Sequence, residues 1–563
     1  MRVVWLDIGS SYSHGSVALP LLHLAALREA VSRGACREAS AIEWKAVRGT
    51  TSEDVHTLAV QAAALEPELV LSSLYLFNRE SVLRVLGRLR ALLPRCLFLL
   101  GGPEFLGDNE AFLRHQHCVT AVARGEGEKV LPSFLTSLRD PESWTAIPGL
   151  CWIDAAGHYH DNGVAHLDET SWRALPSPAS SEFFEWSRAF IHVETSRGCT
   201  QHCSFCTSAR TGAVRWQDLG QVREILREAR ARGVREVRLL DRTFNANLTK
   251  AEERLRLFLD EFADFRFHLE VHPAFLPERL RHLFKAAPPG LFHLEVGLQT
   301  THREALAACE RTADAAASWE GLEFLCSCKN LAVHVDLLAG LPHLPFDHLV
   351  HDLVQVSLLE PAEIQLELLK ILPGTPIVSE VNRHRIVHAT DPPYEVLETS
   401  TMSAQEIEVA RGLSVLVDKF YNSALLRPVV VAAVRQNEHF YTELLEYLRG
   451  VTDLAQPAGL ERRGLLLHQF LAARDPESAS LLEFEWLRGG LPPAKGPGRV
   501  TRWGAAIPLR ATLVAGALPE RLDESRIWML ERRGAREWFV FEGRRERRLP
   551  VAIYREASPA AAS

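Results

Sequence analysis

The sequence predicts an α/β protein: an N-terminal doubly wound parallel sheet, then a partial TIM-type (β/α)6 barrel, then a mostly helical C-terminal region with a small β-rich end. Three observations support this fold class. Short apolar runs alternate with stretches of helical spacing over the first 139 residues, the alternation resumes at residue 191 after the Pro/Ser-rich segment "RALPSPASS", and helical spacing prevails after about residue 385. Alternating strands and helices are typical of parallel sheets.

The first alternation predicts a Rossmann-like domain with a ligand-binding edge. Several of its apolar runs end in polar, small or Gly-rich segments, namely "GSSYSH", "SSLY", "GGPEF" and "RGEGE". Open parallel sheets bind ligands outside the carboxyl ends of their strands, and small residues let a large planar ligand approach the backbone. For each glycine taken singly, a tight turn is the alternative. The expected strands are 3–9, 41–47, 69–77, 96–100 and 119–123.

Residues 140–188 are expected to be a hairpin linker, because "CWIDAAGHYHDNG" places a Gly/Asn turn beside apolar runs. The second alternation then supplies six successive parallel units, which favour a partial barrel whose active site lies at the carboxyl ends of the strands. The expected barrel strands are 191–195, 235–240, 266–271, 292–298, 332–338 and 363–369.

The C-terminal third is expected to begin with helices, such as "SAQEIEVARGLSVLVDKFYNSALL", whose aromatic-rich composition suits a lid over the barrel. A Pro/Gly-rich break, "GGLPPAKGPG", precedes a strand-like basic end, and the tail "EASPAAAS" has the composition of a disordered segment. The expected segments are 1–139 (Rossmann-like), 140–188 (hairpin linker), 189–385 (barrel), 386–495 (helical) and 496–563 (small β-rich end with its tail).

Composition narrows the class of protein. Apolar residues make up 47% and charged residues 24% of the 563 residues, and the net charge is −8, which argues against a uniformly basic nucleic-acid binder. The start "MRVVWLDIGSSYSHGS" lacks the features of a secretory signal, and ten cysteines are too sparse for a disulfide scaffold. We therefore expect a cytoplasmic protein without a membrane span.

Three cysteines, Cys199, Cys203 and Cys206, lie close together in "ETSRGCTQHCSFCTSAR", just after the first expected barrel strand. A structural zinc site is the simple alternative, but it needs four ligands, usually in two separated pairs, and only His202 is near. An iron–sulfur cluster held by three thiolates leaves one iron open to a further ligand. Cys326 and Cys328, in "EFLCSCKN", are expected to end a helix without forming a second cluster.

The spacing C-x₃-C-x-aromatic-C resembles the motif of radical S-adenosylmethionine (SAM) enzymes, and "LLDRTFNAN", "LEVGLQT", "DLLAGLP" and "LKILPGTPI" extend the resemblance along the barrel. The resemblance implies that the three cysteines hold a [4Fe–4S] cluster and that SAM binds its fourth iron. For each further polar residue, an ordinary structural hydrogen bond is the alternative. The SAM-binding residues that the similarity implies are Phe205, Asp241, Thr243, Glu270, Gln299 and Leu341.

The N-terminal domain, joined through a linker to such a barrel, resembles the cobalamin-binding subclass of this superfamily. Many of its cobalamin domains use D-x-H-x-x-G, but here Asp7 is followed by Gly9 at the His position. The resemblance therefore implies cobalamin without the usual protein histidine on cobalt; His14 as a substitute is the rival idea. The implied cobalamin-binding residues are Ser10, Ser11, Tyr12, Ser72, Ser73, Leu74, Gly101, Gly102, Pro103, Glu104, Gly125 and Glu126.

By this resemblance the protein is expected to be a methyltransferase that methylates an unactivated carbon through a 5′-deoxyadenosyl radical and methylcobalamin, with electrons from a donor such as flavodoxin or ferredoxin. Rearrangement or cyclisation without methyl transfer is one alternative, and a cobalamin-binding sensor without catalysis is another. A third is modification of a tRNA base, since "ERRGAREWFVFEGRRERRLP" mixes arginines with aromatic residues; its simple alternative is a solvated hairpin.

Overall fold

The computed structural model describes residues 1–10, 16–32, 42–209, 211–517, 525–532, 535–542 and 549–556. The chain divides into two compact units. The first comprises Met1–Val333, Gly340–Leu344 and Leu368–Ala404; the second comprises His334–Ala339, Pro345–Glu367 and Gln405–Ser563. No helix within the described ranges combines the length and the apolar character that a membrane span requires.

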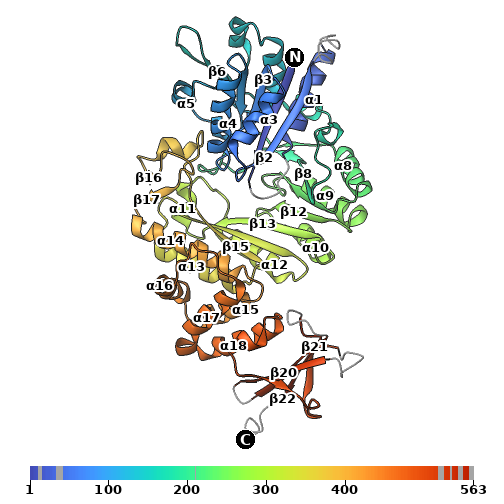
Figure 1. Ribbon diagram of the computed structural model, residues 1–563, viewed down its shortest axis with the longest axis vertical. Helices are drawn as coiled ribbons and strands as arrows, with labels where there is room; N and C mark the ends of the chain where they lie inside the picture. Colours follow the sequence, from blue (N-terminus) through green and yellow to red (C-terminus); the bar gives the residue numbers. More distant parts are fainter. Residues whose placement is uncertain are drawn as a thin grey trace. The chain divides into compact units, whose positions relative to one another are not determined.

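The N-terminal sheet, whose first strands are drawn in blue in Figure 1, has the strand order β2-β1-β3-β4-β5-β6-β7. Its first five strands are parallel, and β6 and β7 add to it as antiparallel strands, so the expected linker hairpin is an extension of this sheet. The elements are β1 (Arg2–Gly9), α1 (Ala18–Ser32), β2 (Glu43–Thr50), α3 (Val55–Ala64), β3 (Leu69–Ser73), α4 (Arg79–Leu92), β4 (Leu97–Gly101), α5 (Glu110–His115), β5 (Ala121–Ala123), α6 (Gly127–Thr136), β6 (Leu150–Ile153), β7 (Tyr159–Asp161) and α7 (Glu169–Arg173).

Helices cover both faces of this sheet, which explains why its central strands are continuous apolar runs. Val4 and Leu6 of β1 pack with α3 and α4 in one core, whereas Val3 and Trp5 pack with α1 and α6 in the other. Asp54 caps α3 by accepting a hydrogen bond from the Thr57 N–H, which fixes where that helix begins. The predicted doubly wound sheet is thus confirmed.

The second sheet has the order β15-β14-β13-β12-β11-β8. Strands β8, β11, β12 and β13 pair in parallel, so their carboxyl ends lie at one edge, as the predicted partial barrel requires. The elements are β8 (Phe190–Val193), β9 (Ser196–Arg197), β10 (Arg215–Trp216), α8 (Leu219–Ala231), β11 (Glu236–Leu239), α9 (Leu248–Glu261), β12 (Arg266–Glu270), α10 (Glu278–Ala286), β13 (Phe292–Gln299), α11 (Arg303–Ala308), α12 (Ala315–Ser327), β14 (Ala332–Ala339), α13 (Phe346–Leu358) and β15 (Glu363–Leu368).

The remaining chain is helical and then antiparallel, as the sequence predicts. The terminal sheet has the order β18-β20-β21-β22-β19, and Phe539 of β21 packs with Trp486 of α18 in a shared core. The elements are β16 (Val387–His388), β17 (Val396–Glu398), α14 (Ala404–Leu416), α15 (Arg427–Gln436), α16 (Phe440–Val451), α17 (Leu460–Arg474), α18 (Pro476–Arg488), β18 (Val500–Trp503), β19 (Thr512–Gly516), β20 (Ser525–Arg532), β21 (Ala535–Glu542) and β22 (Ala552–Glu556).

Candidate active site

A short hairpin carries the three clustered cysteines. Strands β9 and β10 pair antiparallel, and the loop between them contains Cys199, Cys203 and Cys206. Cys203 is buried, whereas the other two are partly exposed. Because the hairpin directly follows β8, this cysteine loop starts from the carboxyl end of the first barrel strand, the edge at which barrel active sites form.

Backbone and hydroxyl groups surround two of the sulfur atoms. The Gln201 N–H donates to Cys199 Sγ at 3.3 Å, and Thr243 Oγ1 lies 3.3 Å from the same sulfur. The Ser208 N–H donates to Cys206 Sγ at 3.4 Å. The two backbone N–H donors stabilise thiolates and are among the groups that tune iron–sulfur clusters. This donor set fits a cluster held by three thiolates.

Arg311 is a neighbour of the third sulfur that the sequence analysis did not single out. Its Nη1 lies 3.6 Å from Cys203 Sγ, and its Nη2 donates to the carbonyl of Gly297. Burial raises the pKa of the Cys203 thiol and the charges of Cys206 and Cys199 add to this, whereas Arg311 lowers it. The three sulfurs are therefore close enough for their charges to interact, and a cation lies beside them.

Asp241 holds the start of the cysteine hairpin. Its carboxylate, fully buried at 0% exposure, accepts from the N–H groups of Thr195 at 2.7 Å and Ser196 at 2.9 Å, and from Thr195 Oγ1 at 2.5 Å. The buried Arg254 donates to Thr195 Oγ1 and to the carbonyl of Gln217 beyond the second hairpin strand. Both oxygens of Asp241 are thus bonded to the protein itself, which gives this expected SAM contact a structural role in the chain as it stands.

Other polar groups lie at the carboxyl edge of the barrel strands and, unlike Asp241, have atoms without hydrogen-bond partners in the described part of the chain. His272 Nε2 and Gln299 Oε1 are buried atoms that have no hydrogen-bond partner among the described residues. Burial lowers the pKa of His272 to about 3, so its imidazole is neutral. Burial also raises the pKa of Glu270 to about 7, against the opposing effect of Arg242. Buried polar atoms normally have partners, so these groups fit a polar ligand.

Gln299 shows local strain at this edge. Its φ is +70°, a conformation that non-glycine residues adopt only where the surroundings impose it. A Cβ on Gly297 would lie 2.7 Å from Gln299 Nε2 and 4.0 Å from Arg311 Nη2, so the glycine leaves room for both side chains. Gln299 therefore lies close to the cation that contacts Cys203. Of the other expected SAM contacts, Phe205 is partly buried beside Cys206, and Thr243 and Leu341 are buried.

At the carboxyl edge of the N-terminal sheet, several expected cobalamin contacts bond to the protein. The Ser72 hydroxyl donates to the carbonyl of Leu6 at 2.8 Å, and the Leu74 N–H donates to that of Gly101 at 2.7 Å. Gly102 has φ +104°, and a Cβ there would lie 2.5 Å from the Leu74 carbonyl oxygen. These residues shape the edge. Ser10, Ser73 and Pro103 are partly exposed there, whereas Ser11, Tyr12 and His14 lie outside the described residues.

Glu104 is held in place by two partners. It accepts a hydrogen bond from the Tyr394 hydroxyl at 2.9 Å and forms an ion pair with Arg79 at 3.3 Å. Burial raises its pKa, and both partners act against that rise. Beyond β3, the rings of Tyr75 and Phe77 stack 5.5 Å apart with 36% and 52% exposure, which leaves an open apolar surface of the kind that planar ligands cover.

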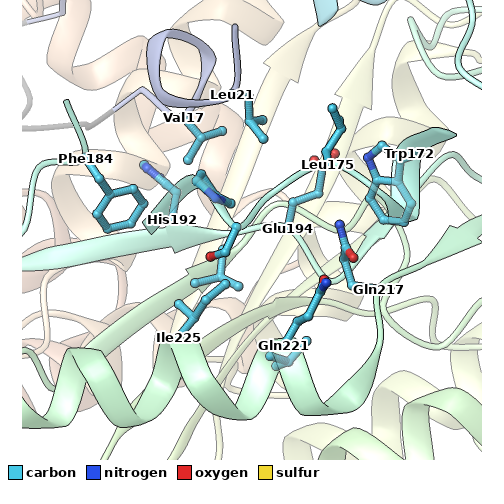
Figure 2. Close-up of a pocket in the computed structure, with 14 residues that line it drawn as sticks. Val17, Leu21, Trp172, Leu175, Phe184, His192, Glu194, Gln217, Gln221 and Ile225 are labelled. Carbon is cyan, nitrogen blue, oxygen red and sulfur yellow. The ribbon is translucent and has the colours of Figure 1, made fainter. Parts of the chain in front are cut away.

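Figure 2 shows a small cavity lined by α1, residues 172–184, β8 and α8. Its volume is about 30 Å³, and its polar lining includes His192, Glu194, Gln217 and Gln221. That volume holds about two water molecules, whereas sites for cofactors of several hundred daltons need hundreds of Å³. This cavity is therefore too small for a cofactor.

The aromatic residues of the basic C-terminal segment are not available to nucleic-acid bases. Trp538 and Phe539 are fully buried at 0% exposure, and Phe541 is buried at 6%. The alternative in which these rings stack on nucleic-acid bases finds no support here, because both faces of this strand are packed. Residues 543–548, which contain further arginines of this segment, lie outside the described residues.

Comparison with known proteins agrees with this geometry. Residues 193–355 match the Radical SAM superfamily, and residues 382–490 match a protein family of unknown function, DUF4080. An uncharacterized methyltransferase from Pyrococcus horikoshii is 27% identical over 167 residues, which cover 27% of this chain and 35% of that protein. The match thus spans about a third of that relative's length.

Two solved structures share the fold. One is the radical SAM methyltransferase TsrM from Kitasatospora setae, with cobalamin and a [4Fe–4S] cluster bound: TM-score 0.55, 16% identity, covering 69% of this chain and 81% of that chain. The other is the cobalamin-dependent SAM radical enzyme OxsB, with aqua-cobalamin and SAM bound: TM-score 0.58, 13% identity, covering 86% of this chain and 78% of that chain.

Proposed function

We propose that this protein is a cobalamin-dependent radical SAM enzyme that transfers a methyl group to an unactivated carbon. The observation that carries the proposal is the cysteine loop itself: three thiols with hydrogen-bond donors or a cation at their sulfurs, at the carboxyl edge of a parallel barrel. The match of residues 193–355 to the Radical SAM superfamily supports the cluster and SAM. The likeness to the TsrM and OxsB folds supports cobalamin at the N-terminal sheet.

In this proposal Cys199, Cys203 and Cys206 hold a [4Fe–4S] cluster, which together with SAM supplies radical chemistry when bound. Arg311 places a positive charge beside the sulfur of Cys203 and lowers the cost of a reduced cluster. Gln299 Oε1 supplies an acceptor for the donor groups of SAM, and His272 Nε2 supplies a donor for its acceptor groups, since both atoms lack partners among the described residues. His272 Nδ1 accepts from the Ala274 N–H, so the neutral ring carries its proton on Nε2.

Glu270 has a different task because its pKa of about 7 leaves a large neutral fraction at physiological pH. As a protonated acid it donates a hydrogen bond to a hydroxyl or carboxylate of SAM, and as a carboxylate it accepts one from a hydroxyl. Asp241 acts indirectly, by fixing the hairpin from which the cysteine loop starts. The Thr243 hydroxyl donates to the carbonyl of Arg242 at 2.6 Å, and its oxygen stays 3.3 Å from Cys199 Sγ.

At the N-terminal sheet, the strand ends near Ser73 and Gly101 and the exposed rings of Tyr75 and Phe77 offer a cobalamin surface. Cobalamin supplies a cobalt centre that can carry a methyl group when bound. Radical SAM enzymes need an external reductant, for which a flavodoxin or ferredoxin is suitable. A cytoplasmic setting, which keeps thiols reduced, suits such a site.

The test follows the fate of SAM. We expect anaerobically reconstituted protein with reductant and cobalamin to release both S-adenosylhomocysteine, the sign of methyl donation, and 5′-deoxyadenosine, the sign of reductive cleavage. A Cys203→Ala variant is expected to lose the second product. Release of 5′-deoxyadenosine alone would favour rearrangement or cyclisation, and release of neither would contradict the proposal.

A further inference from the structure

Glu126, just before α6, binds both strands of the cysteine hairpin. Its Oε1 accepts hydrogen bonds from Arg197 Nη1 and Arg215 Nη2, each at 2.8 Å. Its Oε2 accepts from Arg215 Nη1 at 2.9 Å and from the Leu167 N–H at 2.5 Å. Arg197 and Arg215 face each other across the β9–β10 pair. One carboxylate next to β5 therefore joins both strands at the base of the cysteine loop.

The surroundings make these ion pairs strong. Side-chain exposure is 13% for Glu126, 17% for Arg197 and 8% for Arg215, so water screens them little. Arg197 also binds Glu128 at 2.9 Å and Glu194 at 2.7 Å. Loss of one member of such a buried group leaves the others uncompensated, which makes the group intolerant of substitution.

The ring of Trp172 packs against the two arginines of this ionic group. The guanidinium carbons of Arg197 and Arg215 lie 5.6 and 5.8 Å from the centre of the Trp172 ring. Trp172 and Glu194 also line the small cavity of Figure 2. The segment after the N-terminal sheet thus covers the two arginines and limits their movement.

Glu126 has no acceptor position left for a ligand. A carboxylate offers about four lone-pair directions, and four protein donors occupy them here. This argues for a positioning role at a place where the resemblance implies a cobalamin contact. Asp241 of the barrel also bonds the start of the hairpin, through the N–H groups of Thr195 and Ser196, so the cysteine loop is tied both to the barrel and to the residue that follows the edge of the N-terminal sheet.

We propose that Glu126, Arg197 and Arg215 form an ionic joint that sets the position of the cysteine loop relative to the carboxyl edge of the N-terminal sheet. The joint fixes the distance between the groups bound at those two places. This inference rests on the proposed function for the identity of the two groups, a cluster and a cobalamin. Because Glu126 directly follows Gly125 at that edge, displacement of the carboxylate displaces the edge as well.

The test compares Glu126→Gln with Glu261→Gln in holoenzyme that holds cluster and cobalamin. Glu261 is a matched control, since its carboxylate also accepts from two arginines, Arg223 and Arg227, but only between α8 and α9. Pulsed EPR measures the distance between the reduced cluster and Co(II). We expect a shift or broadening on the order of 1 Å in Glu126→Gln, enough to impair a reaction that depends on near-contact geometry, and the wild-type distribution in Glu261→Gln. A wild-type distribution of cluster–cobalt distances in both variants would contradict the proposed ionic joint.

A second measurement works without cobalamin. Hydrogen exchange of residues 196–216 in the cluster-loaded protein is expected to be faster in Glu126→Gln than in Glu261→Gln, and equal rates would overturn the joint. If wild-type protein binds no cobalamin, the proposed function fails, but the hydrogen-exchange comparison still tests the ionic joint. Should Glu126→Gln fail to fold, Arg215→Lys replaces it in the same measurement, because lysine keeps the charge and loses the two-pronged hydrogen bonding; protection equal to wild type would then count against the joint.

Discussion

At the scale of single residues, Glu270 makes stability depend on pH in an unusual direction. Its raised pKa means that the folded chain favours the neutral acid. The contribution of the neutral Glu270 to the free energy of unfolding is therefore full below the pKa of the unfolded chain, near 4.5, and is lost as pH rises through the folded pKa of about 7. We expect Glu270→Gln, measured without SAM, to raise the melting temperature at pH 8 by about 2–4 °C, the effect of about 1 kcal/mol in a domain of this size.

At pH 5 the same variant is expected to have the melting temperature of the wild-type protein, because Glu270 is then neutral in the folded chain. Thermal unfolding followed by circular dichroism between pH 5 and 8 gives the comparison. A stability difference that stays constant over this range would contradict the assigned burial of the carboxyl group.

Arg311 is predicted to tune the cluster rather than to hold it. A cation 3.6 Å from Cys203 Sγ favours the more negative, reduced state, so Arg311→Gln is expected to lower the reduction potential by ~60 mV, a tenfold change for one electron. Iron content is expected to stay near wild type. Arg303→Gln, an exposed position on α11, is the control, and equal potentials in the two variants would refute the role.

Site residues could be predicted from the sequence only where they lie close together along the chain. Cys199, Cys203 and Cys206 lie within one short loop, so their spacing alone predicts a shared ligand. Arg311 lies 108 residues from Cys203, and no local pattern links the two. Asp241 was found by resemblance, but its bonds to Thr195 and Ser196 depend on how two strands pair, which spacing does not show.

At the scale of elements, the turn after β5 depends on Gly125. Its φ is +101°, and a Cβ would lie 2.3 Å from the carbonyl oxygen of Ala165. Gly157, in the β6–β7 turn, has φ +85° with no atom within 4 Å of such a Cβ. Backbone strain alone is expected to cost about 1–3 kcal/mol in each alanine variant, and only Gly125→Ala adds the clash.

Urea unfolding of the two variants separates these effects. We expect Gly125→Ala to lose clearly more stability than Gly157→Ala, with faster proteolysis near residue 165. Equal losses would show that the close approach of the two segments is not maintained in solution.

This turn also shows why the elements were easier to predict than their roles. The apolar runs at 69–77 and 96–100 gave the strands β3 and β4, because buried parallel strands are continuous apolar runs. The motif "RGEGE" correctly marks a strand end, but Gly125 and Glu126 contact residues 165 and 167 and the cysteine hairpin. Those contacts depend on tertiary packing, which no local pattern encodes.

At the scale of the whole molecule, the order of fold types and the small β-rich end follow from the sequence, whereas the alternative of base stacking in the terminal sheet finds no support. Arginines between aromatic residues in 531–550 suggested base stacking, but Trp538 and Phe539 lie in two cores on opposite faces of the sheet. Consecutive aromatic and apolar residues, as at 538–541, are equally typical of a strand that is packed on both faces, and only the presence of packing partners distinguishes the two.

The central claim is that one chain holds both an iron–sulfur cluster and a cobalamin. Iron and cobalt content, measured on protein produced anaerobically with cobalamin supplied, tests it most directly, with the Cys199/Cys203/Cys206→Ala variant beside the wild type. We predict about four irons and about one cobalt per chain, with iron alone lost in the variant. Iron without cobalt would contradict the claim, because it would leave a radical SAM barrel whose N-terminal sheet serves another ligand.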